Sequence, residues 1–163
     1  MLVRTLQVLV HAEHDTIWNL LLDRLLHPER FTPGVSEMRI VEKTDDVMLR
    51  ELKLHGELVK ERITVKPYDS EIDHELLEHP RFTGKIVIRI VRSARQSPVA
   101  PQHLEYDLEL QRKSFKVQGI VGGEEEIIAD LESELRGLKS RAEEMETMDQ
   151  RAHRGEPPGT ITS

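Results

Sequence analysis

Two neighbouring segments of the chain alternate apolar and polar residues and predict a β-hairpin. Residues 47–54 and 57–65 both show the period of two that is typical of a strand with one buried face. His55-Gly56 between them suits a tight turn. An antiparallel register through this turn places the apolar positions of the two strands opposite one another. The predicted pairs are Leu54 with Glu57, Leu52 with Val59, Arg50 with Glu61, and Met48 with Ile63.

One pair of charged residues interrupts the apolar face of this hairpin. Arg50 lies opposite Glu61, and burying such a pair is costly unless both groups find partners. The turn at Pro67 predicts a register in which His74 lies diagonally from Glu61, within reach of a long side chain. We therefore expect a polar cluster of Arg50, Glu61 and His74 inside an otherwise apolar interior.

The same periodicities predict the remaining elements. Alternation predicts further strands at 2–10, 38–43, 71–78, 83–92 and 103–112, with the acids of the last strand opposite Lys85 and Arg89. Helical spacing predicts a helix that Asp15 caps and that ends at His27-Pro28, followed by a short helical turn at 29–31. A long helix is expected from about 124 to 148. Residues 93–102 are expected to form a loop, and 119–123 a glycine-rich connector.

Composition limits the classes of protein to which the chain can belong. Its 163 residues, 37% hydrophobic and 33% charged, suit one domain, which we expect at 1–148, with a disordered tail at 149–163. The net charge of −7 argues against a nucleic-acid-binding protein. The absence of cysteine is compatible with the cytoplasm, the location that we expect. We expect no membrane span, because no apolar segment is long enough.

The order of these elements, and one hairpin, resemble a known superfamily. One strand, one or two short helices, six antiparallel strands and a long helix resemble the helix-grip fold of the START-like, birch-pollen-allergen-like (SRPBCC) superfamily over roughly residues 1–146. The stretch MLRELKLHGELVKERITVKPYDSEIDHEL resembles the corresponding hairpin of its AtaL-like branch. The resemblance implies an α+β fold in which a curved seven-stranded antiparallel sheet wraps around the C-terminal helix. One departure is the low aromatic content, 3 Phe, 2 Tyr and 1 Trp.

The resemblance also implies a cavity between sheet and helix that binds a small apolar or amphipathic molecule. Some relatives are cyclases or dehydratases that act on polyketides. The resemblance does not assign a catalytic residue to this chain. The internal cluster would orient the polar end of the ligand, since binding sites combine apolar walls with few polar groups. The expected ligand-binding residues are Arg50, Glu61 and His74 at the polar end, and Trp18, Leu52, Ile63, Ile88, Tyr106, Leu108, Leu131 and Leu135 along the walls.

Three functions remain open at this stage. The first is ligand binding, and the second is a small cyclase or dehydratase with Glu61 or His74 as base or acid. The third is a non-catalytic interaction or structural subunit without a ligand, in which Arg50 and Glu61 form a satisfied internal ion pair. A homodimer is also left open. We expect no cofactor and no metal, because His11 and His14 do not have metalloprotease spacing and residues 119–123 lack the Lys-Ser/Thr of a phosphate-binding loop.

Overall fold

The part of the chain that the structure describes forms seven strands, two α-helices and two short 3-10 helices. The structure is a computed structural model, which describes residues 1–92, 101–113, 123–153 and 155. The elements in chain order are β1 (Leu2–Val10), α1 (His14–Leu26), η1 (Pro28–Arg30), β2 (Val35–Lys43), β3 (Val47–Leu54), β4 (Glu57–Lys66), η2 (Pro67–Asp69), β5 (Glu71–Glu78), β6 (Phe82–Arg92), β7 (Gln102–Arg112) and α2 (Glu124–His153).

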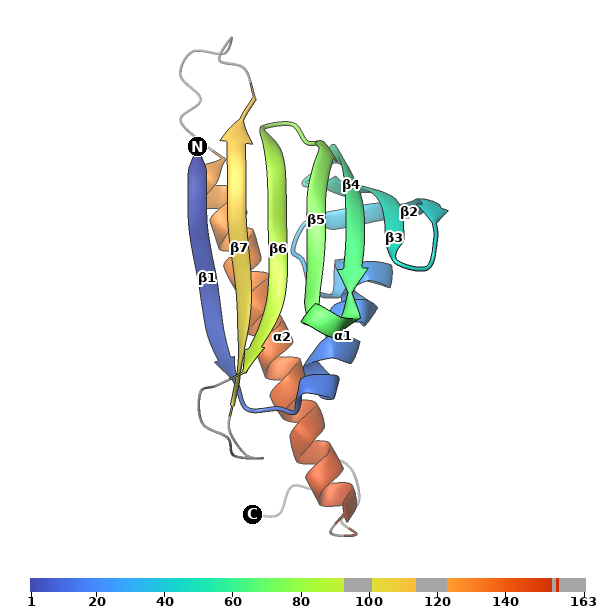
Figure 1. Cartoon of the computed structure of the whole chain (residues 1–163), viewed down its shortest axis with the longest axis vertical. Coiled ribbons are helices and arrows are strands. Elements are labelled where there is room, and N and C mark those ends of the chain that lie inside the picture. Colours follow the sequence, from blue (N-terminus) through green and yellow to red (C-terminus); the bar gives the residue numbers. More distant parts are fainter. Residues whose placement is uncertain (93–100, 114–122, 154, 156–163) are drawn as a thin grey trace.

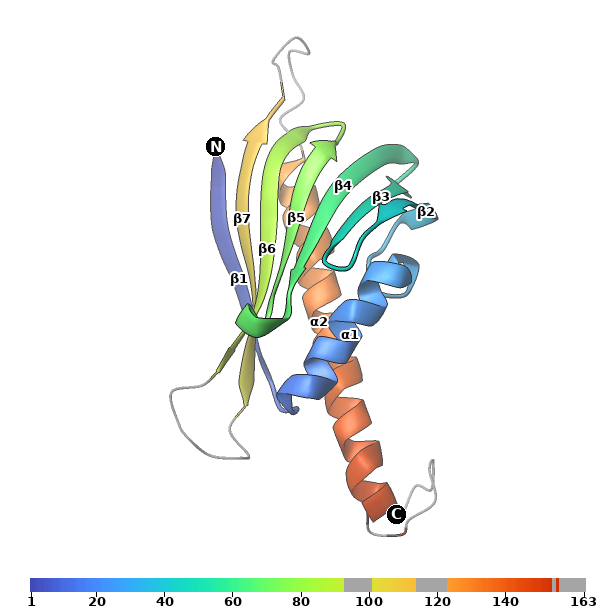
Figure 2. The same ribbon diagram turned by 45° about the vertical axis from the view of Figure 1, so that its right-hand side comes forward.

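All seven strands belong to one antiparallel sheet. The strand order is β1-β7-β6-β5-β4-β3-β2, so β1 joins the last strand and every other neighbour is consecutive in sequence. The sheet curves around α2, which crosses one of its faces, and α1 packs beside α2 on that same face (Figures 1 and 2). This is the expected α+β helix-grip architecture, and the prediction of the fold is confirmed.

The register of the central hairpin is the one that the alternation predicts. Arg50 pairs with Glu61 across β3 and β4, and Ile63 pairs with His74 across β4 and β5. The register follows from the periodicity, because a slip by one residue would move every apolar side chain to the solvent face. The remaining predicted pairs, Leu54 with Glu57, Leu52 with Val59 and Met48 with Ile63, are also present.

Several predicted boundaries were wrong. Helix α1 begins at His14, its N-cap is Glu13, and no side chain caps it; Asp15 instead lies in the first turn, where its charge suits the positive end of the helix. Strand β2 begins earlier, at Val35. Helix α2 continues to His153, into the segment expected to be a tail. Most of the predicted loop at 93–102, most of the glycine-rich connector, and the end of the tail lie outside the described residues.

The apolar core fills the space between the concave face of the sheet and the two helices. Strands β6 and β7 contribute alternate residues such as Ile88, Leu108 and Tyr106, and α2 contributes one stripe of its surface, including Leu135 and Leu138. Burial of such side chains stabilises the fold by about 1.5–3 kcal/mol each.

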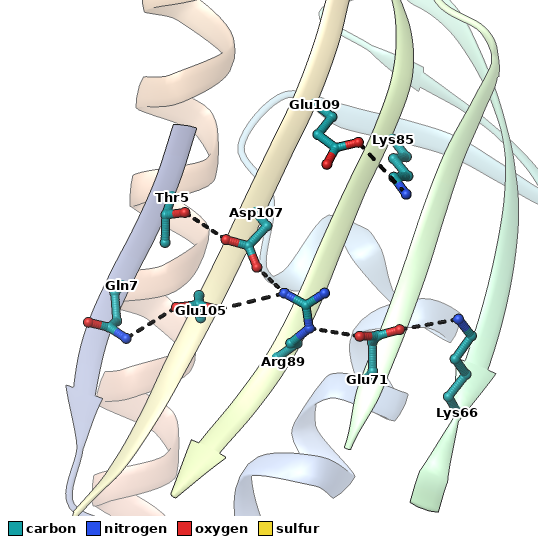
Figure 3. Close-up of polar contacts among 9 residues, drawn as sticks. All are labelled: Thr5, Gln7, Lys66, Glu71, Lys85, Arg89, Glu105, Asp107 and Glu109. Carbon is teal, nitrogen blue, oxygen red and sulfur yellow. Dashed lines mark hydrogen bonds and ion pairs between the residues drawn. The ribbon is translucent and has the colours of Figure 1, made fainter. Parts of the chain in front are cut away.

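The opposite face of the sheet is covered by charged pairs. Arg89 of β6 contacts Glu71 of β5 and both Glu105 and Asp107 of β7 (Figure 3). Lys85 lies opposite Glu109 on the same strands, with a separation of 3.7 Å between charged atoms. The predicted pairing of the acids of the seventh strand with Lys85 and Arg89 is therefore confirmed. This face is the solvated one, which leaves the concave face for the functional site.

Gly84 allows β6 and β7 to approach each other closely. Its φ of +124° lies outside the range that L side chains readily adopt, and an added Cβ would lie 2.1 Å from the backbone carbonyl oxygen of Glu109. A glycine inside a strand is typical of a bend or a close backbone approach.

We predict that Gly84→Ala destabilises the protein by several times the cost of Gly56→Ala. Gly56 also has a positive φ, but an added Cβ there would meet nothing within 4 Å, so only backbone strain of about 1–3 kcal/mol applies. Free energies of unfolding from urea titration check this. Equal losses in the two variants would show that the strand approach at Gly84 is not constrained.

Candidate functional site

A cavity lies between the concave face of the sheet and the helices, and we call it the inner chamber. Its volume is about 80 Å³, which corresponds to roughly two or three water molecules. The walls come from strands β2 to β7, both α-helices and the segment after α1. The lining residues include Arg24, Thr32, Arg50, Leu52, Val59, Glu61, His74, Leu76, Ile86, Ile88, Tyr106, Leu131 and Glu134.

The inner chamber brings together most of the residues that the sequence singled out. Its lining includes the predicted polar cluster and four of the predicted apolar positions, namely Leu52, Ile88, Tyr106 and Leu131. Ile63, Leu108 and Leu135 are buried in the core, but they do not line the chamber. Trp18 is also absent from its lining, and its ring stacks on His14 at a centroid distance of 6.3 Å.

The three predicted polar residues are directly bonded. Arg50 donates from Nη2 to Glu61 Oε2 at 3.1 Å, and the same oxygen lies 2.6 Å from His74 Nδ1. Arg50 also donates from Nη1 to the backbone carbonyl of Leu25 at 3.0 Å, near the C-terminal end of α1. The cluster therefore links three strands of the sheet to the first helix.

Two further charged residues extend this cluster, and sequence reasoning missed both. Arg24 of α1 donates from Nη2 to His74 Nε2 at 2.7 Å, and its Nη1 lies 3.0 Å from Glu134 Oε1 of α2. Glu134 also accepts hydrogen bonds from Tyr106 (2.6 Å) and Thr32 (2.8 Å). We call Arg50, Glu61, His74, Arg24 and Glu134 the internal network.

A signal for the two missed residues was present in the sequence. Arg24 follows Leu20 by four positions and Leu21 by three, so it lies within the apolar stripe of its helix. Glu134 follows Leu131 by three positions and precedes Leu138 by four. A charge at such a position is the helical counterpart of a charge on the apolar face of a strand.

The hydrogen bonds fix the protonation of His74. A guanidinium can only donate, so Nε2 of His74 accepts from Arg24, and Nδ1 carries the proton and donates to Glu61. Burial lowers the pKa of His74, and the charge of Arg24 lowers it further. His74 is therefore neutral at neutral pH.

The carboxylates of the internal network balance its guanidinium groups. Burial would raise the pKa of Glu61, but the charge of Arg50 and the hydrogen bond from the neutral His74 outweigh it, and the pKa lies well below its usual range. Burial and the nearby Glu134 raise the pKa of Tyr106 well above its usual value. Two guanidinium groups thus face two carboxylates inside the protein.

Not every donor of the internal network is used. The Nε atoms of Arg24 and Arg50 are buried, and neither has a hydrogen-bond partner among the described residues. Buried donors normally find an acceptor on the protein, on water or on a ligand. Both arginines line the inner chamber, so an acceptor for these donors could bind there.

A second cavity of about 220 Å³ adjoins the inner chamber, and we call it the vestibule. The two cavities share Leu54, His79, Ile127 and Asp130 as lining residues. Two ion pairs at the vestibule join turns of the sheet to α2. His55 of the β3–β4 turn pairs with Asp130 at 2.9 Å, and Arg81 of the β5–β6 turn pairs with Glu126. The vestibule is therefore the outer part of the same site.

The two histidines that were considered as metal ligands, His11 and His14, form hydrogen bonds to separate groups of residues. His11 contacts Glu143 of α2, whereas His14 contacts Asp15 and Ser70. Within the described residues, no group of three or more His, Cys, Asp or Glu side chains is arranged to hold a metal ion. Likewise, no helix in the described part of the chain has the length and apolarity that a membrane crossing requires.

Comparison with known families decides the classification. The family model described as "AtaL: Acetylaranotin biosynthesis cluster protein L" matches residues 7–107, more than half of the chain. The chain belongs to the AtaL family. The prediction made from the hairpin motif is confirmed. No curated protein matches this AtaL-family chain.

Solved structures share the fold of this AtaL-family protein at low sequence identity. A START superfamily protein from Mycobacterium smegmatis is 18% identical with a TM-score of 0.63, covering 88% of this chain and 98% of that one. The Zhui aromatase/cyclase from Streptomyces sp. R1128 is 19% identical with a TM-score of 0.62, covering 98% and 100%. The di-domain ARO/CYC StfQ from the steffimycin biosynthetic pathway is 15% identical with a TM-score of 0.72, covering 89% of this chain and 52% of that one.

We predict that stability falls as the pH is lowered below about 6.5, the ordinary pKa of histidine. The folded-state pKa of His74 is depressed, so the unfolded chain takes up a proton that the folded chain refuses. The stability that neutral His74 contributes is fully present above the pKa of the unfolded chain. It is lost as the pH falls toward the pKa of the folded chain, by up to about 1.4 kcal/mol per pH unit for one proton. Burial also depresses the pKa of His79, which acts in the same direction.

Urea titrations from about one pH unit above to about one pH unit below the ordinary histidine pKa measure how the free energy of unfolding changes with pH. In His74→Gln the dependence of stability on pH should be weaker by up to about 1.4 kcal/mol per pH unit, the contribution of one proton. An unchanged pH dependence in this variant would contradict the neutral, buried state of His74.

We predict that Arg24→Met costs far more stability than Arg89→Met. Arg24 is buried, and its loss leaves the charge of Glu134 without its cation, which costs about 3–5 kcal/mol. Arg89 is about 40% exposed on the outer face, where solvent screens its three ion pairs and each contributes at most about 1 kcal/mol. Urea unfolding of both variants provides the comparison, and losses of similar size would show that the internal network does not stabilise the fold.

Proposed function

We propose that this protein binds a small, predominantly apolar molecule with one polar end. The observation that carries the proposal is the inner chamber itself: a cavity with mostly apolar walls, along which the internal network provides a compact polar surface. Sites for small molecules have this composition. The apolar walls would supply most of the affinity, and the network would orient the ligand.

The size of the inner chamber limits how a ligand can bind. Ligand cavities typically measure about 300–1,000 Å³, whereas the chamber measures about 80 Å³. A ligand of more than a few heavy atoms must therefore extend into the vestibule. The ion pairs of His55 with Asp130 and of Arg81 with Glu126 would separate or shift to admit it.

The geometry favours binding over acid–base chemistry by the predicted residues. Both ring nitrogens of His74 are engaged, and Glu61 has a pKa well below its usual range, so neither is prepared to transfer protons near neutral pH. A cyclase or dehydratase remains the second candidate, because two similar structures are described as an aromatase/cyclase and an ARO/CYC. Such a reaction would depend on binding at the same chamber.

We predict that Ile127→Trp abolishes uptake of an apolar probe, whereas Ile128→Trp does not. Ile127 lines both cavities, so a larger side chain there fills the passage between them. Ile128 lies on the same helix and packs against the core, but it lines neither cavity. The measurement is fluorescence of the neutral dye N-phenylnaphthylamine, whose emission rises in apolar surroundings.

Circular dichroism and urea unfolding would confirm that both variants fold. We expect the wild type and Ile128→Trp to bind the dye and Ile127→Trp not to bind it. A wild type that binds no dye, or an Ile127→Trp variant that binds it as well as the wild type does, would overturn the proposed function.

A further inference from the structure

His79 lies at the junction of the inner chamber and the vestibule. It follows the end of β5, and its side chain lines both cavities. The residue is only 8% exposed, and its ring packs against that of Phe82 at a centroid distance of 5.6 Å. His79 is one of the four residues that line both cavities, so a ligand that extends from the chamber into the vestibule passes close to it.

Backbone hydrogen bonds fix the tautomer of His79. The N–H groups of Arg81 and Phe82 both donate to Nδ1 of His79, each at 3.1 Å. An atom that accepts two hydrogen bonds cannot carry a proton, so the proton of the neutral ring is on Nε2. The turn between β5 and β6 therefore sets both the position of the ring and its hydrogen-bonding character.

The Nε2–H group of His79 makes no hydrogen bond to another described residue, and the small exposed part of the ring leaves it open to an acceptor in the cavities. The Nε–H groups of Arg24 and Arg50 are fully buried and unpaired, so the site has more hydrogen-bond donors than its own side chains satisfy. A ligand that complements this site must offer a hydrogen-bond acceptor.

The charges around His79 disfavour an anionic acceptor. The carboxylates in the vestibule are Glu57, Glu126 and Asp130, whereas Glu61 in the chamber is already balanced by Arg50. Arg81 and Lys113 are the cations that act on His79, and Arg81 is paired with Glu126. An uncharged oxygen avoids repulsion by the surplus of acids and the cost of burying a further charge.

We propose that His79 determines ligand specificity: its Nε2–H group donates a hydrogen bond to an uncharged oxygen acceptor, a ketone-type carbonyl, on the bound molecule. This inference rests on the proposed function, because it requires a ligand in the chamber. It adds the class of that ligand, a neutral carbonyl compound and not a carboxylic acid. His79 acts by binding, and no chemical step is assigned to it.

Three probes of nearly equal size test the proposal: acetophenone, α-methylstyrene and benzoate. They share a phenyl ring and differ in the group that would face His79, which is a carbonyl, an alkene or a carboxylate. Dissociation constants come from chemical-shift titrations of the full chain. Wild type should bind acetophenone about tenfold more tightly than α-methylstyrene, the factor that one ordinary hydrogen bond supplies. Benzoate should bind more weakly than acetophenone.

Two substitutions separate the donor from the turn. His79→Asn keeps an acceptor near the position of Nδ1 for the two backbone N–H groups and removes the distal donor. The preference for acetophenone should then fall to about one. His79→Gln places an amide N–H near the position of Nε2 and should restore part of the preference.

A measurement on the wild type avoids any dependence on folding of the variants. A long-range proton–nitrogen correlation spectrum should show the Nε2–H tautomer of His79 in the free protein. Its Nε2–H resonance should shift on addition of acetophenone and not of α-methylstyrene.

The outcomes distinguish this proposal from the one on which it rests. Equal binding of ketone and alkene without a shift at His79 would overturn the carbonyl assignment and leave the binding function intact. Tightest binding of benzoate would also overturn it. Binding of none of the three probes, together with no uptake of N-phenylnaphthylamine, would overturn both proposals.

Discussion

The structure depends on the bridge that Arg24 forms between the sheet and the last helix. One guanidinium donates to His74 of β5 and pairs with Glu134 of α2, while its own backbone belongs to α1. All three side chains are buried. Dispersion and burial hold helices against a sheet without specifying one arrangement. A buried charge that needs two particular partners does specify one, and it places the helices where the inner chamber lies between them and the sheet.

The same bridge determines what the site can do. Arg24 occupies the free nitrogen of His74, and His74 together with Arg50 keeps Glu61 ionised. The groups that could have transferred protons are thus committed to one another. The groups without a hydrogen-bond partner among the described residues of the site are donors. They are the Nε–H groups of Arg24 and Arg50, and the Nε2–H group of His79 at the junction of the inner chamber and the vestibule. A site with apolar walls and spare donors is suited to hold a molecule that carries an acceptor.

How much of this could be predicted from the sequence depended on the kind of element. The strand register, and with it the contact of Arg50, Glu61 and His74, followed from a period of two and two turn signals, because a slip would reverse every face. The partners on the helices were missed because helical stripes are broad and tolerate a charge at the edge, although Arg24 and Glu134 lie within theirs. His79 could not be found from a pattern, since its role depends on backbone N–H groups of a turn. The volume of the chamber depends on how all the side chains pack, which no local pattern contains.

Native mass spectrometry of the freshly purified protein tests the central claim most directly. The account predicts a second species, heavier than the 18.8 kDa chain by the mass of one small neutral molecule, and absent from Ile127→Trp. The contradicting result is a folded chain that carries no added mass and acquires none when incubated with neutral carbonyl compounds that fit the chamber and the vestibule. In that case the internal network would be a structural brace and nothing more.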